Sequence, residues 1–159
     1  MGHGARQERV EHETARKVGV EFRDDWPDEA RVAVELYVEA MVTILPRWVR
    51  SLHLRWDATD GEHSAKVYTD TRNRWATITV CAQWLDEVEK ERWDSLVHEV
   101  VHVYMDGMSD AFRMAIQQLD NDAAQKIGER WFSDAEEQAV TDLTDMVARV
   151  VPGRRGSDG

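Results

Sequence analysis

The chain has 159 residues, a formal net charge of −11 at pH 7 and 42% hydrophobic residues, which suits one globular domain with a sizeable core. The negative charge disfavours binding to nucleic acid or to an anionic membrane surface. Cys81 is the only cysteine, which excludes an intrachain disulfide, and residues 1–17 lack the apolar stretch of a signal peptide. We expect a cytoplasmic protein with no membrane span.

The two ends of the chain differ in composition from its middle. Residues 1–24 carry many charges and few apolar side chains, which predicts a flexible N-terminal tail. Residues 152–159 are small and polar, and we expect a second flexible tail there. No linker or internal repeat interrupts residues 25–151, which are predicted to form a single domain.

The first predicted element is a core helix that follows Trp26. Pro27 suits a first helical position, and the two acidic residues after it complement the helix dipole. Apolar residues then recur at helical spacing as far as Leu45, and Pro46 ends the pattern. We expect packing, and not chemistry, to be the role of this helix.

A change of hydrophobic period after Pro46 predicts a small β-sheet. Apolar and polar residues alternate over 48–56 and again over 65–69. Residues 75–81 form the strongest strand pattern because they are rich in β-branched side chains. Since the connections are short, we expect three strands in a mostly antiparallel sheet, and an α+β fold overall.

The helical period returns after Trp84. Asp86 and Glu89 suggest a capped start, and Gly107 suggests the end of this helix. Apolar residues form one face of it: Trp93, Leu96, Val97, Val100 and Tyr104.

The remaining segment predicts two or three more helical pieces. Residues 109–119 have the pattern of a short amphipathic helix, and 120–131 are more polar and suggest a weaker helix or a lid-like connection. Ser133 and Glu136 have the spacing of a capping box, which predicts that a final helix opens at Ser133 and runs to Val150.

The helix that follows Trp84 contains the pentapeptide His98-Glu99-Val100-Val101-His102. Histidines four residues apart on a helix project from one face, within reach of a single metal ion. Both lie nearly opposite the apolar face. The helix is therefore expected to pack one side on the sheet and to present two imidazoles and a carboxylate to a cleft.

This H-E-x-x-H pattern resembles the active-site helix of the zincin metallopeptidases, and the order of elements over residues 27–150 is similar to that of compact, minimal gluzincins. The resemblance implies a zincin-like fold and one Zn²⁺ per chain, held by His98 and His102. It also implies that Glu99 acts as the general base for a zinc-activated water.

The third zinc ligand implied by the resemblance is a glutamate on a downstream helix. Glu136 and Glu137 both fall in the final predicted helix. Glu136 lies in line with the packing stripe and has a capping role to fill, whereas Glu137 lies about a third of a turn away from that stripe. Helical geometry therefore favours Glu137, with Glu136 as the alternate ligand.

Three further features follow from the resemblance. Residues 75–81 are either the strand edge that aligns an extended peptide or an ordinary strand of the sheet. Val140 and Thr141 stand four residues past Glu136 and Glu137, where larger gluzincins have an aspartate, so Asp142 or Asp145 would have to orient a histidine. The candidate donors to a substrate oxyanion, chosen by residue type, are Tyr68, Tyr104, His53 and His63.

These patterns favour a zinc metallopeptidase that hydrolyses a peptide or protein substrate and binds neither nucleic acid nor membrane. The alternative is a zincin-fold regulatory or binding module with little or no proteolytic activity. A third, weaker interpretation is an acidic interaction protein in which the pentapeptide is coincidental. The sequence carries no signal for an oligomeric state.

Overall fold

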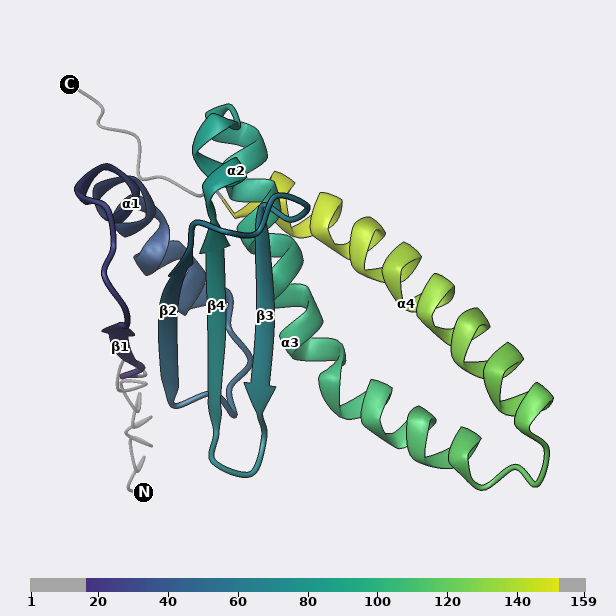
Figure 1. The fold of residues 1–159 in the computed structure, drawn as a ribbon. Helices are drawn as coiled ribbons and strands as arrows, with labels where there is room; N and C mark the ends of the chain where they lie inside the picture. The colour runs from purple at the N-terminus through teal and green to yellow at the C-terminus, as the bar shows by residue number, and fades with distance from the viewer. Residues whose placement is uncertain (1–16, 152–159) are drawn as a thin grey trace, which may run out of the picture.

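The computed structural model describes residues 17–151 and confirms the α+β class. Four helices accompany one mixed sheet within these residues (Figure 1). In chain order the elements are β1 (Gly19–Phe22), α1 (Asp28–Ile44), β2 (Ser51–Asp57), β3 (Ala65–Asp70), β4 (Trp75–Cys81), α2 (Ala82–Asp86), α3 (Glu89–Gln117) and α4 (Asp122–Val150). Residues 1–16 of the predicted N-terminal tail and the whole predicted C-terminal tail, 152–159, lie outside the described residues.

The sheet corrects two expectations. Its strand order is β1-β2-β4-β3, so it has four strands and not three. The β1–β2 and β2–β4 pairs are parallel, and only β3–β4 is antiparallel. The prediction of a mostly antiparallel sheet is therefore wrong. Short connections join β2 to β3 and β3 to β4, but in the sheet β4 lies between β2 and β3, so β2 pairs in parallel with β4. Sequence periodicity does not reveal this strand order.

The fourth strand comes from the segment that was predicted to be a tail. Gly19 to Phe22 pair in parallel with Ser51 to Leu54 of β2. Most of this strand is exposed, but Phe22 packs its ring against Trp26 with the centroids 5.4 Å apart. This strand is mostly exposed and is held by backbone pairing with β2, which is distant in sequence. It therefore needs few apolar side chains, and its composition resembles that of a tail.

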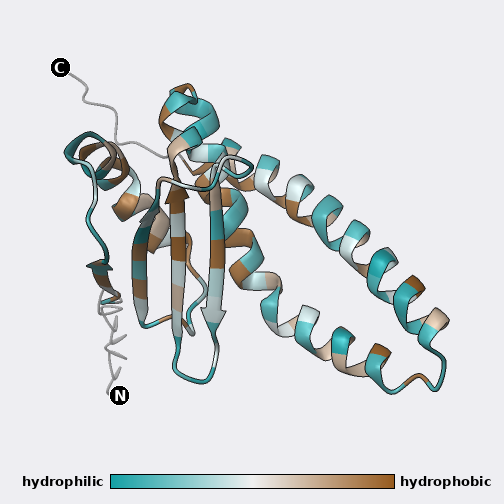
Figure 2. Cartoon of the chain, in the orientation of Figure 1, coloured by the Kyte–Doolittle hydropathy of each residue, from teal (hydrophilic) through white to brown (hydrophobic). Residues whose placement is uncertain are grey.

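The core lies between the sheet and the helices behind it. One side of α1 is buried at Ala30, Val34, Tyr37 and Met41, and the first half of α3 is buried around Leu96. Figure 2 shows hydrophobic residues on the strands and on the helix segments beside them. The sheet and α1 thus form a rigid support against which α3 is fixed.

Helix α3 is longer than the sequence predicts. It runs without interruption from Glu89 to Gln117, through Gly107 and through the whole segment 109–119. The expected stop at Gly107 and the expected separate helix are therefore wrong. Gly107 does not adopt the positive φ of a helix C-cap, and α4 packs against the continued helix. Phe112 of α3, for example, stacks on Phe132 of α4 with ring centroids 4.2 Å apart.

Helix α4 starts earlier than expected. Asn121 caps it by accepting hydrogen bonds from the backbone N–H groups of Ala123 and Ala124, so residues 120–131 are not a lid and Ser133 does not open the helix. Together α3 and α4 form a long antiparallel hairpin that projects from the sheet (Figure 1). Among residues 17–151, no helix combines the length and apolar character needed to cross a membrane.

The continuous α3 predicts that Gly107→Ala stabilises the protein. A Cβ at position 107 would meet no atom within 4 Å, and alanine in a helix interior is favoured over glycine by about 0.5–1 kcal/mol. Gly128→Ala is the matched control, because its Cβ would lie 3.3 Å from Ile116 Cδ1 and would need that side chain to move. Thermal unfolding should show a rise of about 2–4 °C for Gly107→Ala and a smaller rise or a loss for Gly128→Ala. An unfolding temperature lowered by Gly107→Ala would contradict the continuous helix.

Candidate metal centre

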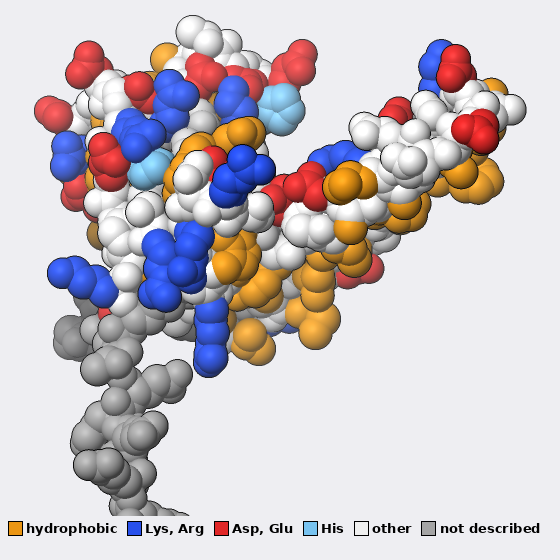
Figure 3. Space-filling model, turned by 90° about the horizontal axis from the view of Figure 1, so that it is seen from below, with side chains coloured by type: hydrophobic (Ala, Val, Ile, Leu, Met, Phe, Trp, Pro, Cys, Tyr) orange, Lys and Arg blue, Asp and Glu red, His pale blue; other side chains and the backbone are white. Residues whose placement is uncertain are grey.

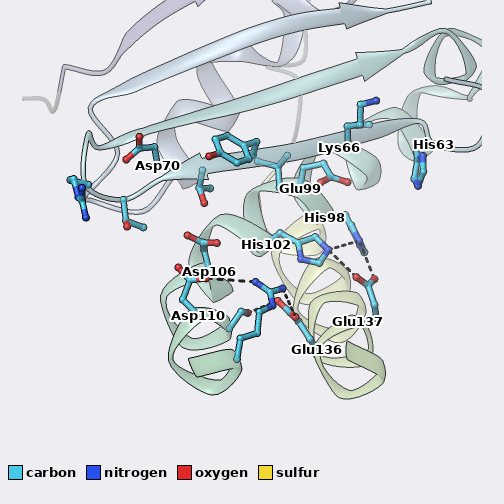
Figure 4. A pocket seen from close by; sticks show the side chains of 18 of the residues that line it. His63, Lys66, Asp70, His98, Glu99, His102, Asp106, Asp110, Glu136 and Glu137 are labelled. Atoms are coloured by element: carbon cyan, nitrogen blue, oxygen red, sulfur yellow. Dashed lines mark hydrogen bonds and ion pairs between the residues drawn. The ribbon is translucent and has the colours of Figure 1, made fainter. Parts of the chain in front are cut away.

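The two histidines of the pentapeptide and one glutamate of α4 converge at the base of the hairpin (Figure 4). The Nε2 atoms of His98 and His102 are 3.2 Å apart. Glu137 approaches both rings, with Oε1 3.3 Å from His102 Nε2 and Oε2 3.7 Å from His98 Nε2. Among the described residues, these three form a group whose ligand atoms all lie within 4.8 Å of one another.

The spacing of these atoms fits a tetrahedral zinc site. Zinc binds imidazole nitrogen and carboxylate oxygen at about 2.0–2.2 Å, so two ligand atoms on a tetrahedron lie about 3.4 Å apart. The three observed separations of 3.2, 3.3 and 3.7 Å scatter around that value. Without an ion, the same spacing lets one imidazole donate a hydrogen bond to the other. Two imidazoles and one carboxylate are also a donor set used by catalytic zinc, with a fourth position left open.

The charge state of His98 suits metal binding. Burial lowers the pKa of His98, and the neighbouring His102 lowers it further, against an opposing effect of Glu137. His98 is therefore neutral at pH 7, which is the form that ligates a metal. Glu137 remains more than half exposed, so an ion at this point remains accessible from the cleft.

Glu99 lies beside this group and is almost buried, with 9% of its surface exposed. The backbone N–H of Val67 in β3 donates a hydrogen bond to its carboxylate. Burial raises the pKa of Glu99 to about 8, and the charge of Glu137 adds to the effect. A carboxyl group with this pKa can accept and release a proton near neutral pH, as a general base must.

Glu136, the alternate third ligand, turns away from the histidines. Its Oε1 accepts a hydrogen bond from Ser109 Oγ at 2.5 Å, and its Oε2 lies 3.9 Å from Arg113 Nη2. It therefore joins α4 to α3 about two helical turns beyond His102 along α3 (Figure 4). The structure thus brings Glu137 to the histidines and leaves Glu136 a structural contact.

A cleft of about 1000 Å³ runs between β3 and the α3–α4 hairpin, and His98, Glu99, His102 and Glu137 all line it. All six residues of β3 line its other side. Of the two interpretations of residues 75–81, the edge of the cleft is wrong and the ordinary strand of the sheet is confirmed, because β4 is hydrogen-bonded to β2 on one side and to β3 on the other. The edge strand is β3, which the chain places after β2 but the sheet places outside β4.

The four candidate oxyanion donors separate into two pairs. His53 is buried on β2, where it contacts Arg23 and the ring of Trp75. Tyr104 Oη donates a hydrogen bond to the backbone oxygen of Ile44, 2.8 Å away. Neither lines the cleft, whereas His63 and Tyr68 do.

The two candidate aspartates also separate. Asp142 accepts a hydrogen bond from Gln138, also on α4. Asp145 lines a smaller pocket that shares His98 with the cleft. That pocket also contains Asp94 and Thr144, each with one buried side-chain oxygen that has no hydrogen-bond partner. Asp145 is thus the better placed of the two aspartates.

Three contributors to the site escape sequence reasoning. The Val67 N–H is a backbone group, and only the sheet topology shows that it faces the cleft. Asp94 precedes His98 by four residues, a spacing that would have placed it on the same helix face. Ser109 follows His102 by seven residues and so shares that face too, but the predicted stop at Gly107 concealed it.

No protein-family model matches the chain, and neither curated proteins nor solved structures show a significant similarity to it. The function must therefore be inferred from the residues and from their geometry.

Proposed function

We propose that the protein is a zinc-dependent metallopeptidase with a zincin-like fold. The observation that carries this proposal is the convergence of His98, His102 and Glu137, with Glu99 beside them on the same cleft. These three side chains would hold the ion. When bound, zinc supplies a Lewis acid that lowers the pKa of a coordinated water and polarises a carbonyl group.

Glu99 is the proton carrier of the proposed reaction. Its carboxylate accepts a proton from the water that attacks the scissile carbonyl, and delivers that proton to the nitrogen of the leaving amine. The hydrogen bond from the Val67 N–H fixes the position of the carboxylate against β3. Burial beside the cleft keeps the pKa of Glu99 in the range that this exchange requires.

The free edge of β3 is the proposed binding site for the substrate backbone. Because Val67 directs its N–H away from β4 and toward Glu99, the alternate residues Ala65 and Thr69 direct their backbone groups to the same side. An extended peptide that adds to this edge would lie in the cleft, alongside the histidines of α3. His63 or Tyr68 would supply the donor to the substrate oxyanion.

The proposal is tested by cleavage of an unbiased peptide library. We expect the zinc-loaded protein to cleave a subset of peptides, chelation to abolish the cleavage and zinc to restore it. A preparation of His98→Ala made in parallel controls for contaminating proteases and should be inactive with or without zinc. If one zinc binds per chain and no peptide is cleaved, the peptidase proposal is wrong and a zincin-like binding or regulatory module replaces it.

A further inference from the structure

The α3–α4 hairpin exposes large hydrophobic side chains that no other part of the described chain covers. Trp131 is 73% exposed, Tyr104 57% and Met108 55%. They belong to two rows of residues that recur mainly at four-residue spacing and contain no charge. We call these rows the apolar face: Tyr104, Met108, Ala111 and Ala115 on α3 and Leu119 just after it, with Ile127, Trp131, Ala135, Ala139, Leu143 and Val147 on α4.

The two rows lie on one side of the hairpin. Phe112 and Ile116 mark the side of α3 that meets α4, since Phe112 stacks on Phe132 and Ile116 lies next to Gly128. Helical phase then places the α3 row on one flank of that contact, and His98 and His102 on the other flank. The apolar face is therefore on the side of the hairpin away from the metal ligands. Figure 3 shows hydrophobic side chains along the projecting hairpin.

A hollow of about 380 Å³ opens on this face at the base of the hairpin, between α3, α4 and the end of α1. Its lining is hydrophobic: Ile44, Val100, Val101, Tyr104, Leu143, Val147, Val150 and Val151. Trp131 precedes Leu143 by twelve residues, so its exposed indole lies about 18 Å from the hollow along the helix. The face thus carries a projecting aromatic ring and a recess at different points of its length.

The area of the face is that of a stable interface. The α4 row runs from Ile127 to Val147, a length of about 30 Å, and two adjacent helices are about 20 Å wide. This corresponds to roughly 600 Å² on each copy, or about 1200 Å² in total, which is the lower end of the range for specific, stable interfaces. Monomeric proteins seldom leave an apolar patch of this size exposed.

We propose that the apolar face pairs two copies of this chain. A projection and a recess on the same face fit each other when a second copy is turned end for end, because a two-fold interface is self-complementary. Trp131 of each copy then enters the hollow of the other, and the four helices form a bundle. The metal centres, on the opposite side of each hairpin, remain open.

The charges beside the face are mixed in sign. Toward the free end of α4, Lys126 and Arg130 alternate with acidic residues such as Asp134, and Asp142 lies toward its base. The pairing therefore rests on the apolar face and not on attraction between charges. The charge of −11 on each chain opposes association, so dimerisation should strengthen as salt screens it.

The molar mass of the full chain in solution tests the pairing. Sedimentation at micromolar concentration should give twice the 18.4 kDa of one chain, and Trp131→Glu should weaken the dimer by about 30-fold or more. Met114→Glu is the matched control. Met114 is 67% exposed on the same hairpin, but helical phase puts it opposite Phe112 and Ile116, off the apolar face, so the dimer should persist. A monomeric wild-type chain, or a dimer unaffected by Trp131→Glu, would overturn the proposal.

A symmetric cross-link tests the geometry separately. Ala139 lies on the face about midway between Trp131 and Val147, so two copies of Ala139→Cys should meet near the two-fold axis and form an intermolecular disulfide on mild oxidation. Thr141→Cys, two residues farther along and on the side of the small pocket, should stay reduced. The native Cys81 is fully buried and does not compete. Equal cross-linking of the two variants would exclude this face as the interface.

Discussion

Replacing Glu99 with glutamine is expected to reduce peptide cleavage by about 10²–10⁴-fold while leaving zinc binding intact. Glutamine keeps the shape of the side chain and can still accept the hydrogen bond from the Val67 N–H, but its amide cannot take a proton from water. The ligand atoms of His98, His102 and Glu137 are untouched. The measurements are kcat/KM on a cleaved peptide and zinc content by elemental analysis.

Asp110→Asn is the control for this experiment. It removes one negative charge from the same cleft without touching the metal ligands, and we expect less than about a tenfold change in kcat/KM, since it contributes only a screened charge. Cleavage by Glu99→Gln at a rate comparable with that of Asp110→Asn would show that the proton is carried by another group.

The second large expected effect is a difference in zinc affinity between variants of the two adjacent glutamates. Glu137→Gln should weaken zinc binding by more than about 100-fold, because even the loss of a hydrogen-bond partner of a ligand costs about 10–100-fold. Glu136→Gln should leave zinc affinity nearly unchanged, since Glu136 contacts Ser109 and Arg113 and not the histidines. It should instead lower stability by about 1 kcal/mol through the buried contact with α3. Competition with a chromophoric chelator measures the affinity, and equal losses in both variants would exclude Glu137 as a specific ligand.

The local chemistry of the site could be predicted from the sequence, because it depends on positions within one helix. The four-residue spacing of His98 and His102 and their position opposite the apolar stripe follow from helical periodicity alone. The same reasoning favoured Glu137 over Glu136. The structure brings Glu137 within reach of both histidines although the predicted helix start was wrong, since the phase of α4 around residue 137 does not depend on where the helix begins.

The architecture around the site could not be predicted in the same way, because it rests on contacts between distant residues. The β1 strand is held by pairing with β2, and its own composition suggests a tail. The parallel pairing of β2 with β4 makes β3 the edge strand, so the strand nearest the pentapeptide in sequence is not the one at the cleft. Glycine has a low helix propensity, but Gly107 stays helical because α4 packs along α3 on both sides of it.

The apolar face could not be predicted from the sequence either, because it also depends on how distant segments come together. Met108 fell between two predicted helices and Trp131 ended a segment that was predicted to be a weaker helix or a lid-like connection, and neither segment alone shows a continuous surface. Only when α3 and α4 extend through Gly107 and Ser133 into one hairpin do the two rows align. The corrected helix boundaries therefore revealed both the face and its position opposite the metal ligands.

The zinc content of the purified full chain, compared with that of His98→Ala, tests the metal centre most directly. The proposed site predicts one zinc per chain in the wild type and none in His98→Ala after equal exposure to zinc and equal dialysis. Unfolding followed by circular dichroism confirms that the variant is folded. A folded His98→Ala that keeps one zinc per chain, or a wild-type chain that binds none, would contradict a metal centre built from His98, His102 and Glu137.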